Sequence, residues 1–349
     1  MEETKKPVIE LKEVIDLRNT DFNALVEKAE RIEKESTDYM VTQANSNNVR
    51  FNDNFGLTFV PDEGEVEDLR LTHHSLGQLG TKIGVPSRYI EKCIASGRID
   101  LAKDNVNSWL EDYNKSLFIR EYRGRIRGIL SNKYSVCDSD TILNVFSDVM
   151  GNRLANYDIK GNFLNEERLH LRMVNKERMN IDGEDLFSGI FIDSSDVGRS
   201  ILKVNYGVYK LVCTNGLVIA KAGGTLFEQK HVGISADDLR DGLKEAFEKL
   251  PVLEDNARQW IEFARNTPCK EVAFDIKHLS EEDMDSFVES IRQKTMLSKE
   301  SATKVVELMR TKYDGSKWGL INGITEVAQD FTLERRLELE TIAGGMLVA

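Results

Sequence analysis

Hydrophobic and polar residues alternate with three different periods along the chain. Residues 1–114 mix helical and strand-like patterns, residues 115–233 alternate mainly with period two, and residues 234–349 repeat apolar positions every three or four residues. A period of two indicates strands, and a spacing of three to four indicates helices. We therefore expect an α+β protein with a mixed α/β N-terminal region, a central antiparallel β-rich core containing basic hairpins, and a helical, acidic C-terminal third. That last third either packs with the core as one domain or forms a region of its own.

Apolar spacing and capping residues locate the helices. In the last third, Ser235 with Asp238 forms a capping box, and Ser280 and Ser298 each precede a helical pattern. Asp138 or Ser139 can cap a helix in the same way. Further helices are expected over residues 22–34, 75–83, 87–95, 101–113, 141–150, 319–330 and 333–343.

Turn signals are fewer and sit inside the β-rich region. The Asn215-Gly216 pair lies between two strand-like runs, and both residues tolerate the positive φ angles of a tight hairpin turn. We also interpret the polar run from Asp193 to Asp196 as a turn between strands. Both signals favour antiparallel strand pairs.

The most basic part of the chain is a hairpin pattern over residues 116–134, SLFIREYRGRIRGILSNKY. Period two places Phe118, Arg120 and Tyr122 on one face of the first strand, opposite Leu117 and Ile119. In the second strand Arg125 and Arg127 share a face. The pattern predicts one apolar side that packs on a core and one side where arginine alternates with aromatic rings.

A second run, RLHLRM, repeats this character. Arg168, His170 and Arg172 alternate with leucine and methionine, so one face is basic and the other apolar. Two interpretations stay open: both faces are simply solvated, or both bind phosphates and stack bases. The sequence does not decide whether they belong to one sheet. The residues expected to bind nucleic acid are Phe118, Arg120, Tyr122, Arg123, Arg125, Arg127, Lys133, Arg168, His170 and Arg172.

Composition and charge narrow the class of protein. The chain has 349 residues, of which 40% are hydrophobic and 30% are charged, as in an ordinary soluble globular protein. No stretch approaches the roughly 20 apolar residues of a membrane span, and the N-terminus lacks the apolar region of a secretion signal. We expect a cytoplasmic protein without membrane contact. Its four cysteines are scattered, so we expect reduced thiols rather than disulfides or a zinc site. The net charge of −12 makes the local basic hairpin stand out.

Motifs for cofactor chemistry are missing from the sequence. It contains no P-loop, dinucleotide fingerprint, paired-histidine metalloprotease motif or nucleophile elbow. We expect no cofactor, no metal and no catalytic residue, which favours a non-enzymatic protein without excluding an enzyme. Asp138 and Asp140 suit either a divalent cation or helix capping, and capping is favoured. We interpret the His73-His74 pair as helix-start surface and Arg335-Arg336 as a solvated helix face with ion pairs.

Four passages carry a family resemblance: RIRGILSNKYSVCDSDTIL, YKLVCTNGLVI, EFARNTP and WGLINGITEVAQDFTLERRLELETIAGG. From about residue 115 to the C-terminus the chain resembles the uncharacterised phage/plasmid-like proteins, a domain-of-unknown-function family found on phages, prophages and conjugative plasmids. The resemblance implies a mobile-element protein in the host cytoplasm that takes part in DNA transactions or counters host defences. It implies no catalytic residues.

A looser similarity concerns the fold alone. Phage single-strand annealing proteins of the radiation-repair recombinase type use a basic, curved β-hairpin backed by a helix, and they assemble into rings. The hairpin of residues 117–130 followed by the helix of residues 141–150 is similar to that unit. This similarity implies a homo-oligomer.

Three functional hypotheses follow. The first is a protein that binds or anneals single-stranded DNA during recombination or replication, through the basic residues above. The second is an interaction protein that inhibits a host defence or DNA-processing factor with an acidic, DNA-mimicking surface. The third is a metal-dependent nuclease that uses Asp138 and Asp140.

Overall fold

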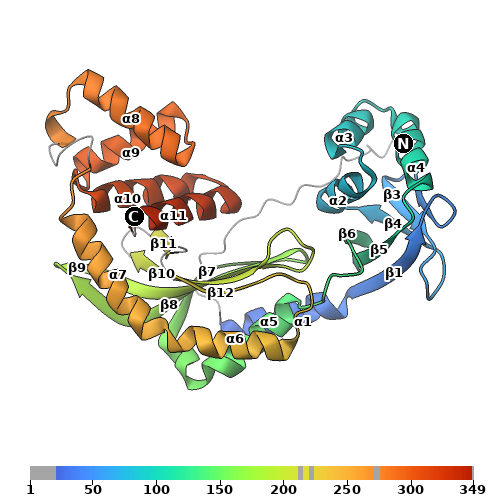
Figure 1. Ribbon diagram of the computed structural model, residues 1–349, viewed down its shortest axis with the longest axis horizontal. Coiled ribbons are helices and arrows are strands. Elements are labelled where there is room, and N and C mark those ends of the chain that lie inside the picture. The colour runs from blue at the N-terminus through green and yellow to red at the C-terminus, as the bar shows by residue number, and fades with distance from the viewer. Residues whose placement is uncertain (1–20, 211–214, 220–223, 270–275, 348–349) are drawn as a thin grey trace, which may run out of the picture.

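The computed structural model (Figure 1) describes residues 21–210, 215–219, 224–269 and 276–347. The predicted α+β class is confirmed, with two antiparallel-rich sheets and a helical C-terminal region. Each sheet has its own hydrophobic core. We call the two parts the first and the second unit.

The first unit is a six-stranded sheet with three helices on one face. Its strand order is β1-β5-β6-β4-β3-β2, and every pair is antiparallel except β4 with β6. Apolar residues from one face of the sheet pack against α2, α3 and α4. Its elements are β1 (Ser36–Ala44), β2 (Val49–Phe51), β3 (Gly56–Phe59), β4 (Glu67–Leu71), α2 (His73–Ile83), α3 (Ser87–Ala95), α4 (Ile99–Glu111), β5 (Lys115–Tyr122) and β6 (Arg125–Leu130).

The second unit contains a sheet with the strand order β11-β10-β9-β8-β7, and β12 also pairs with β10. Its strands are β7 (Tyr157–Leu164), β8 (Arg168–Ile181), β9 (Glu184–Ser195), β10 (Leu202–Lys210), β11 (Asn215–Ile219) and β12 (Thr225–Gln229). The apolar face of this sheet is covered by α1, α5, α6 and α7, whereas α10 and α11 lie on the opposite side (Figure 1).

The helices of the second unit come from both ends of the chain. They are α1 (Phe22–Lys34), α5 (Ser139–Met150), α6 (Ala236–Glu248), α7 (Leu250–Arg265), α8 (Glu281–Thr295), α9 (Lys299–Thr311), α10 (Lys317–Val327) and α11 (Leu333–Leu347), with short 3-10 turns at Gly151–Asn156, Ile276–His278 and Ala328–Asp330. Although α1 precedes the first unit, its buried face packs on α5, where the rings of Phe22 and Phe146 stack 6.1 Å apart. The chain therefore passes between the units twice, at Glu35 and over residues 131–138.

Most predicted elements are present, with local differences. The capping box of Ser235 and Asp238 is formed, and Ser280 and Ser298 cap α8 and α9. β10 and β11 form the expected antiparallel pair, but Asn215 and Gly216 belong to β11 and pair with residues of β10. Residues 211–214, which connect the two strands, lie outside the described residues. The position after residue 114, where we expected a region boundary, joins α4 to β5 within the first unit.

Candidate functional site

The structure places the basic residues predicted to bind nucleic acid in two different sheets. β5 and β6 belong to the first unit, and β8 belongs to the second. The interpretation that both basic strand faces are solvated is largely wrong, because each face packs against another part of the protein. Those exposed by 6% or less are Arg120, Arg127, Arg168, His170 and Arg172; Phe118 and Tyr122 are half-buried, and Arg123, Arg125 and Lys133 are exposed.

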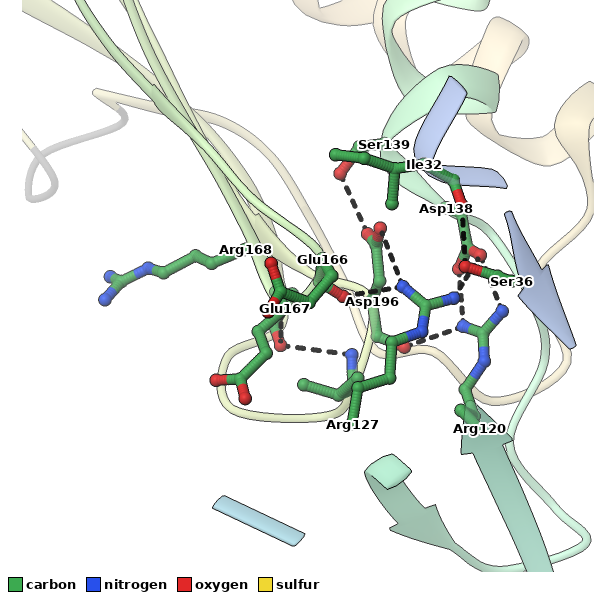
Figure 2. Close-up of polar contacts among 12 residues, drawn as sticks. Ile32, Ser36, Arg120, Arg127, Asp138, Ser139, Glu166, Glu167, Arg168 and Asp196 are labelled. Carbon is green, nitrogen blue, oxygen red and sulfur yellow. Dashed lines mark hydrogen bonds and ion pairs between the residues drawn. The ribbon is translucent and has the colours of Figure 1, made fainter. Parts of the chain in front are cut away.

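Arg120 lies at the centre of the joint between the two units (Figure 2). Its guanidinium donates to both carboxylate oxygens of Asp138, each at 2.6 Å, and to both oxygens of Asp38 at 2.9 and 3.0 Å. It also donates to the backbone carbonyl of Asp196 at 2.7 Å. Burial alone would favour the neutral form, but the two carboxylates raise the pKa of Arg120. This side chain is therefore held as a buried cation.

Arg127 meets the same carboxylate from the neighbouring strand. It donates to the carbonyl of Glu166 at 2.6 Å and lies 3.4 Å from Asp138 and 3.8 Å from the Asp196 carboxylate. Burial and the nearby Asp138 raise the pKa of Asp196, while Ser139 donates a hydrogen bond to it at 2.9 Å. Two arginines of the first unit thus face two aspartates of the second.

Asp138 does not cap its helix through its side chain, contrary to our expectation. It occupies the N-cap position of α5, but it makes no side-chain hydrogen bond there, because its oxygens accept from Arg120 and Arg127. Asp140 stays half-buried in the first turn, and burial raises the pKa of its carboxyl. Within the described residues, no group of three or more His, Cys, Asp or Glu side chains is placed to hold a metal ion.

The loop between β9 and β10 is inserted into the first unit. The predicted turn at Asp193–Asp196 is wrong for its first three residues, which belong to β9. Val197, which follows, is fully buried against Gly128, where an added Cβ would lie 3.0 Å from the Cβ of Val197. The Val197 carbonyl meets His74 Nε2 at 3.1 Å and accepts from Gln78 Nε2 at 2.8 Å. The absence of a side chain at Gly128 thus leaves room for the loop.

The histidine pair in α2 divides between two environments. His73 is exposed, as we expected for a helix start, and its Nε2 lies 3.0 Å from a carboxylate oxygen of Glu91. His74 is instead directed into the joint, where burial lowers its pKa to about 4. It is therefore neutral at pH 7 and donates from Nε2 to the Val197 carbonyl.

The basic residues of β8 form a second buried network under α11. Glu340 accepts from Arg172 at 3.1 and 2.7 Å and from Arg336 at 2.9 Å. Arg172 Nε donates to His170 Nε2 at 3.1 Å, so His170 is neutral, and burial lowers its pKa. Arg168 pairs with Asp193 and with Glu334 of α11. Arg336 forms the predicted helical ion pair, but it is buried rather than solvated.

One pair of buried polar side chains has the composition of a nucleophile and its base. Ser194 Oγ lies 3.2 Å from His231 Nε2, and the His231 ring stacks on Tyr134 at 5.3 Å. Ser194 is fully buried and His231 is exposed by only 5%. Because a substrate has no access to a fully buried hydroxyl, we interpret this pair as structural.

The arginines that stay available lie beside the β5–β6 turn. Arg125 is the parallel neighbour of Arg70 in β4 and the antiparallel neighbour of Tyr122 in β5. The side chains of Arg70 and Arg125 are exposed, and neither side chain has a hydrogen bond or ion pair to any described residue. Arg123 pairs with Glu35 and lies 5.2 Å from the Tyr122 ring. We call Arg70, Arg125, Tyr122 and Arg123 the arginine row.

The arginine row faces away from the helices of the first unit. The next residues along β4 and β6, Leu71 and Ile126, are buried in the core with α2, α3 and α4. Because successive side chains of a strand point to opposite faces, Arg70 and Arg125 project from the other face. Arg120 and Arg127 leave that same face to enter the joint.

Comparison with known families matches residues 127–341 to the domain of unknown function DUF932. The match covers more than half of the chain, so the chain belongs to this family. It includes Arg127, Asp138 and Asp196 of the joint, but it begins after Arg125. Comparison with the curated proteins and with the solved structures finds no match. Among the described helices, none combines the length and the apolar character that crossing a membrane requires.

Proposed function

We propose that this protein binds single-stranded DNA along the arginine row and serves annealing or strand handling in recombination or replication. The observation that carries the proposal is the pair Arg70 and Arg125, which lie side by side, exposed and without a partner among the described residues. Like charges on neighbouring strand positions repel each other, and a bound anion removes that cost. Phosphates of a nucleic acid strand are such anions.

Aromatic rings on the same face supply the second part of a single-strand site. Tyr122 lies next to Arg125 across the strands, and Phe118 lies further along β5 on the same face. Both rings are half-buried, and Phe118 stacks on Tyr134 with centroids 6.3 Å apart. Bases stack on such rings without regard to sequence, so we expect little sequence preference.

The cellular setting of this activity is part of the proposal. The resemblance to phage/plasmid-like proteins supports a role in mobile-element DNA transactions in the host cytoplasm. Similarity to ring-forming annealing proteins supports assembly of several copies, and light scattering with and without DNA measures it. An interaction with a host protein is the alternative, and it predicts a stoichiometric host partner together with no affinity for DNA.

Fluorescence anisotropy of a labelled oligothymidine, titrated with protein at several salt concentrations, tests the proposal. We expect the double variant Arg70→Glu, Arg125→Glu to bind more weakly and to reduce the slope of log K against log salt by about 1.4, since each phosphate contact in a single strand contributes about 0.7. Arg88→Glu is the matched control. Arg88 is an exposed arginine of α3, on the helical side of the sheet, and it has no partner among the described residues.

The possible outcomes separate cleanly. Weak binding by the double variant, with normal binding by Arg88→Glu, supports the site. An equal loss in both variants indicates a general charge effect and removes the arginine row from the site. If the unmodified protein fails to bind even at low salt, DNA binding itself is wrong.

A further inference from the structure

The basic face predicted from the hairpin exists, but the second unit covers part of it. Arg120 and Arg127 both reach the same oxygen of Asp138, at 2.6 and 3.4 Å, so they leave the sheet on one side (Figure 2). That side also carries Tyr122 and Arg125. Without the second unit, Arg127 and Arg120 would therefore be added to the exposed surface beside the arginine row, and Arg120 would keep its hydrogen bonds to Asp38 of β1.

The group that covers Arg120 has the chemistry of the proposed ligand. Arg120 donates two parallel hydrogen bonds to the Asp138 carboxylate, each 2.6 Å long. Guanidinium groups bind phosphates through the same two-pronged geometry. The two carboxylate oxygens of Asp138 thus occupy the positions that two oxygens of a phosphate would take on Arg120. Asp138 and a phosphate therefore cannot occupy these positions at the same time.

The joint between the units contains many polar contacts. The hydrophobic cores of the two units are separate, and most specific contacts across the joint are ion pairs and hydrogen bonds. Apolar contacts across the joint include Val197 against Gly128, Leu130 against Gly198, and Tyr122 against the core of the second unit. Charged groups that separate are solvated again, which offsets much of the lost attraction. Interfaces of this kind within a chain commonly permit relative motion.

We propose that the contact of Arg120 and Arg127 with Asp138 and Asp196 is an autoinhibitory latch on the DNA site. With the latch closed, single-stranded DNA meets only the arginine row. With the latch open, Arg127 joins the row together with the Arg120 nitrogens that Asp138 now occupies, while Asp38 stays paired with Arg120, and the strand is bound more tightly. This inference rests on the proposed function, since it names the regulation of the same site. A strand that binds the open form better shifts the protein toward that form.

A disulfide across the joint tests the latch. Gly128 and Val197 belong to different units, and a Cβ on Gly128 would lie 3.0 Å from the Cβ of Val197. Disulfides need about 3.5 to 4.5 Å, so a small shift permits the bond in the variant Gly128→Cys, Val197→Cys. Thiol titration reports closure as the loss of two thiols between the reduced and the oxidised variant, with the four cysteines of the unmodified protein as the baseline. Oxidation locks the joint, and reduction releases it.

We expect the reduced variant to bind oligothymidine at least about tenfold more tightly than the oxidised variant, because it gains two charged hydrogen-bonding groups. Small-angle scattering should show that DNA enlarges the reduced protein but not the oxidised one. The single variant Gly128→Cys controls for the effect of the reductant. Asp138→Asn, which weakens the latch without a cross-link, should bind more tightly than the unmodified protein, whereas Asp148→Asn, an exposed site on the same helix, should not.

Two failures are distinguishable. If oxidised and reduced proteins bind equally and Asp138→Asn gains no affinity, the latch is wrong while DNA binding at the arginine row stands. If no form binds DNA, the proposed function fails and the latch fails with it. If circular dichroism shows that the cross-linked variant is unfolded, the DNA affinities of Asp138→Asn and Asp148→Asn decide whether the latch exists.

Discussion

Removing the charge of Glu340 tests whether the second buried network holds α11 on the sheet. Glu340 is fully buried and accepts three hydrogen bonds, two from Arg172 and one from Arg336. Glu340→Gln keeps the size of the side chain but leaves two buried guanidinium groups without their carboxylate. Breaking a buried ion pair by removing one partner costs about 3 to 5 kcal/mol. We expect a loss of that size in the free energy of unfolding.

The measurement is urea unfolding followed by circular dichroism. With an m-value of about 3 kcal/mol per molar, the midpoint should fall by about 1 to 1.7 M. Glu338→Gln is the matched control, because Glu338 lies on the same helix, is 54% exposed and pairs with Arg335. Exposed pairs contribute at most about 1 kcal/mol. If Glu340→Gln and Glu338→Gln lose equal stability, the buried ion pairs of Glu340 with Arg172 and Arg336 do not hold α11 on the sheet.

A charge-free version of the triad refines this prediction. Replacing Arg172, Arg336 and Glu340 together by Met, Leu and Leu removes the three charges that meet at Glu340. Apolar replacement of a buried ionic cluster is commonly neutral or stabilising. We expect the triple variant to recover most of the stability lost by Glu340→Gln. A triple variant less stable than the single one would show that the hydrogen bonds themselves carry the energy.

Three further predictions use single positions. Between pH 6.5 and about 4 the unfolded chain binds more protons at His74 than the folded protein does. Acidification from pH 7 to pH 5 should therefore lower the free energy of unfolding by about 1 to 2 kcal/mol, and the variant His74→Gln should not show this loss. Denaturant titrations in which the two proteins depend equally on pH would contradict this prediction. In α2, Gly77→Ala should stabilise the protein by about 0.5 to 1 kcal/mol, because an added Cβ meets no atom within 4 Å. Gly80→Ala should destabilise it by about 1 to 3 kcal/mol, because the added Cβ collides with the Val85 carbonyl. Melting temperatures that shift in the same direction for both variants would contradict this prediction. Ser235→Ala should cost about 1 kcal/mol by removing the side-chain hydrogen bond to the Asp238 amide of α6, and an unchanged melting temperature would show that this cap is not needed.

Local patterns in the sequence predict most helices because their causes are local. The apolar residues of α1 recur at helical spacing, and serine caps precede α6, α8 and α9. Alternation with period two likewise predicts the strands β5, β6 and β8. Each of these signals depends only on residues within a few positions of one another.

The fate of the basic strand faces depends on distant residues and was not predictable in this way. Period two separates Arg120 from Ile119, but it does not show that a second unit covers the arginine side. Asp138 and Asp196 look like a helix cap and a turn residue, because those are the commonest local uses of aspartate. The ion pair of Asp138 with Arg120 joins positions 18 residues apart, and the hydrogen bond from Arg120 to the Asp196 carbonyl joins positions 76 residues apart. The only hint in the sequence is the excess of arginine on a face next to aspartate-rich segments.

The position of α1 has a consequence for the order in which the chain is made. This helix is synthesised before the first unit, yet its partner Phe146 follows that whole unit in the chain. The apolar stripe of α1, with Leu25, Ala29 and Ile32, therefore stays without its native contacts while residues 36–130 emerge and fold. Exposed apolar stripes of this kind attract chaperones or other nascent chains. Early docking of α5 ends that exposure, so the speed of translation through residues 131–150 sets how long the nascent protein is at risk.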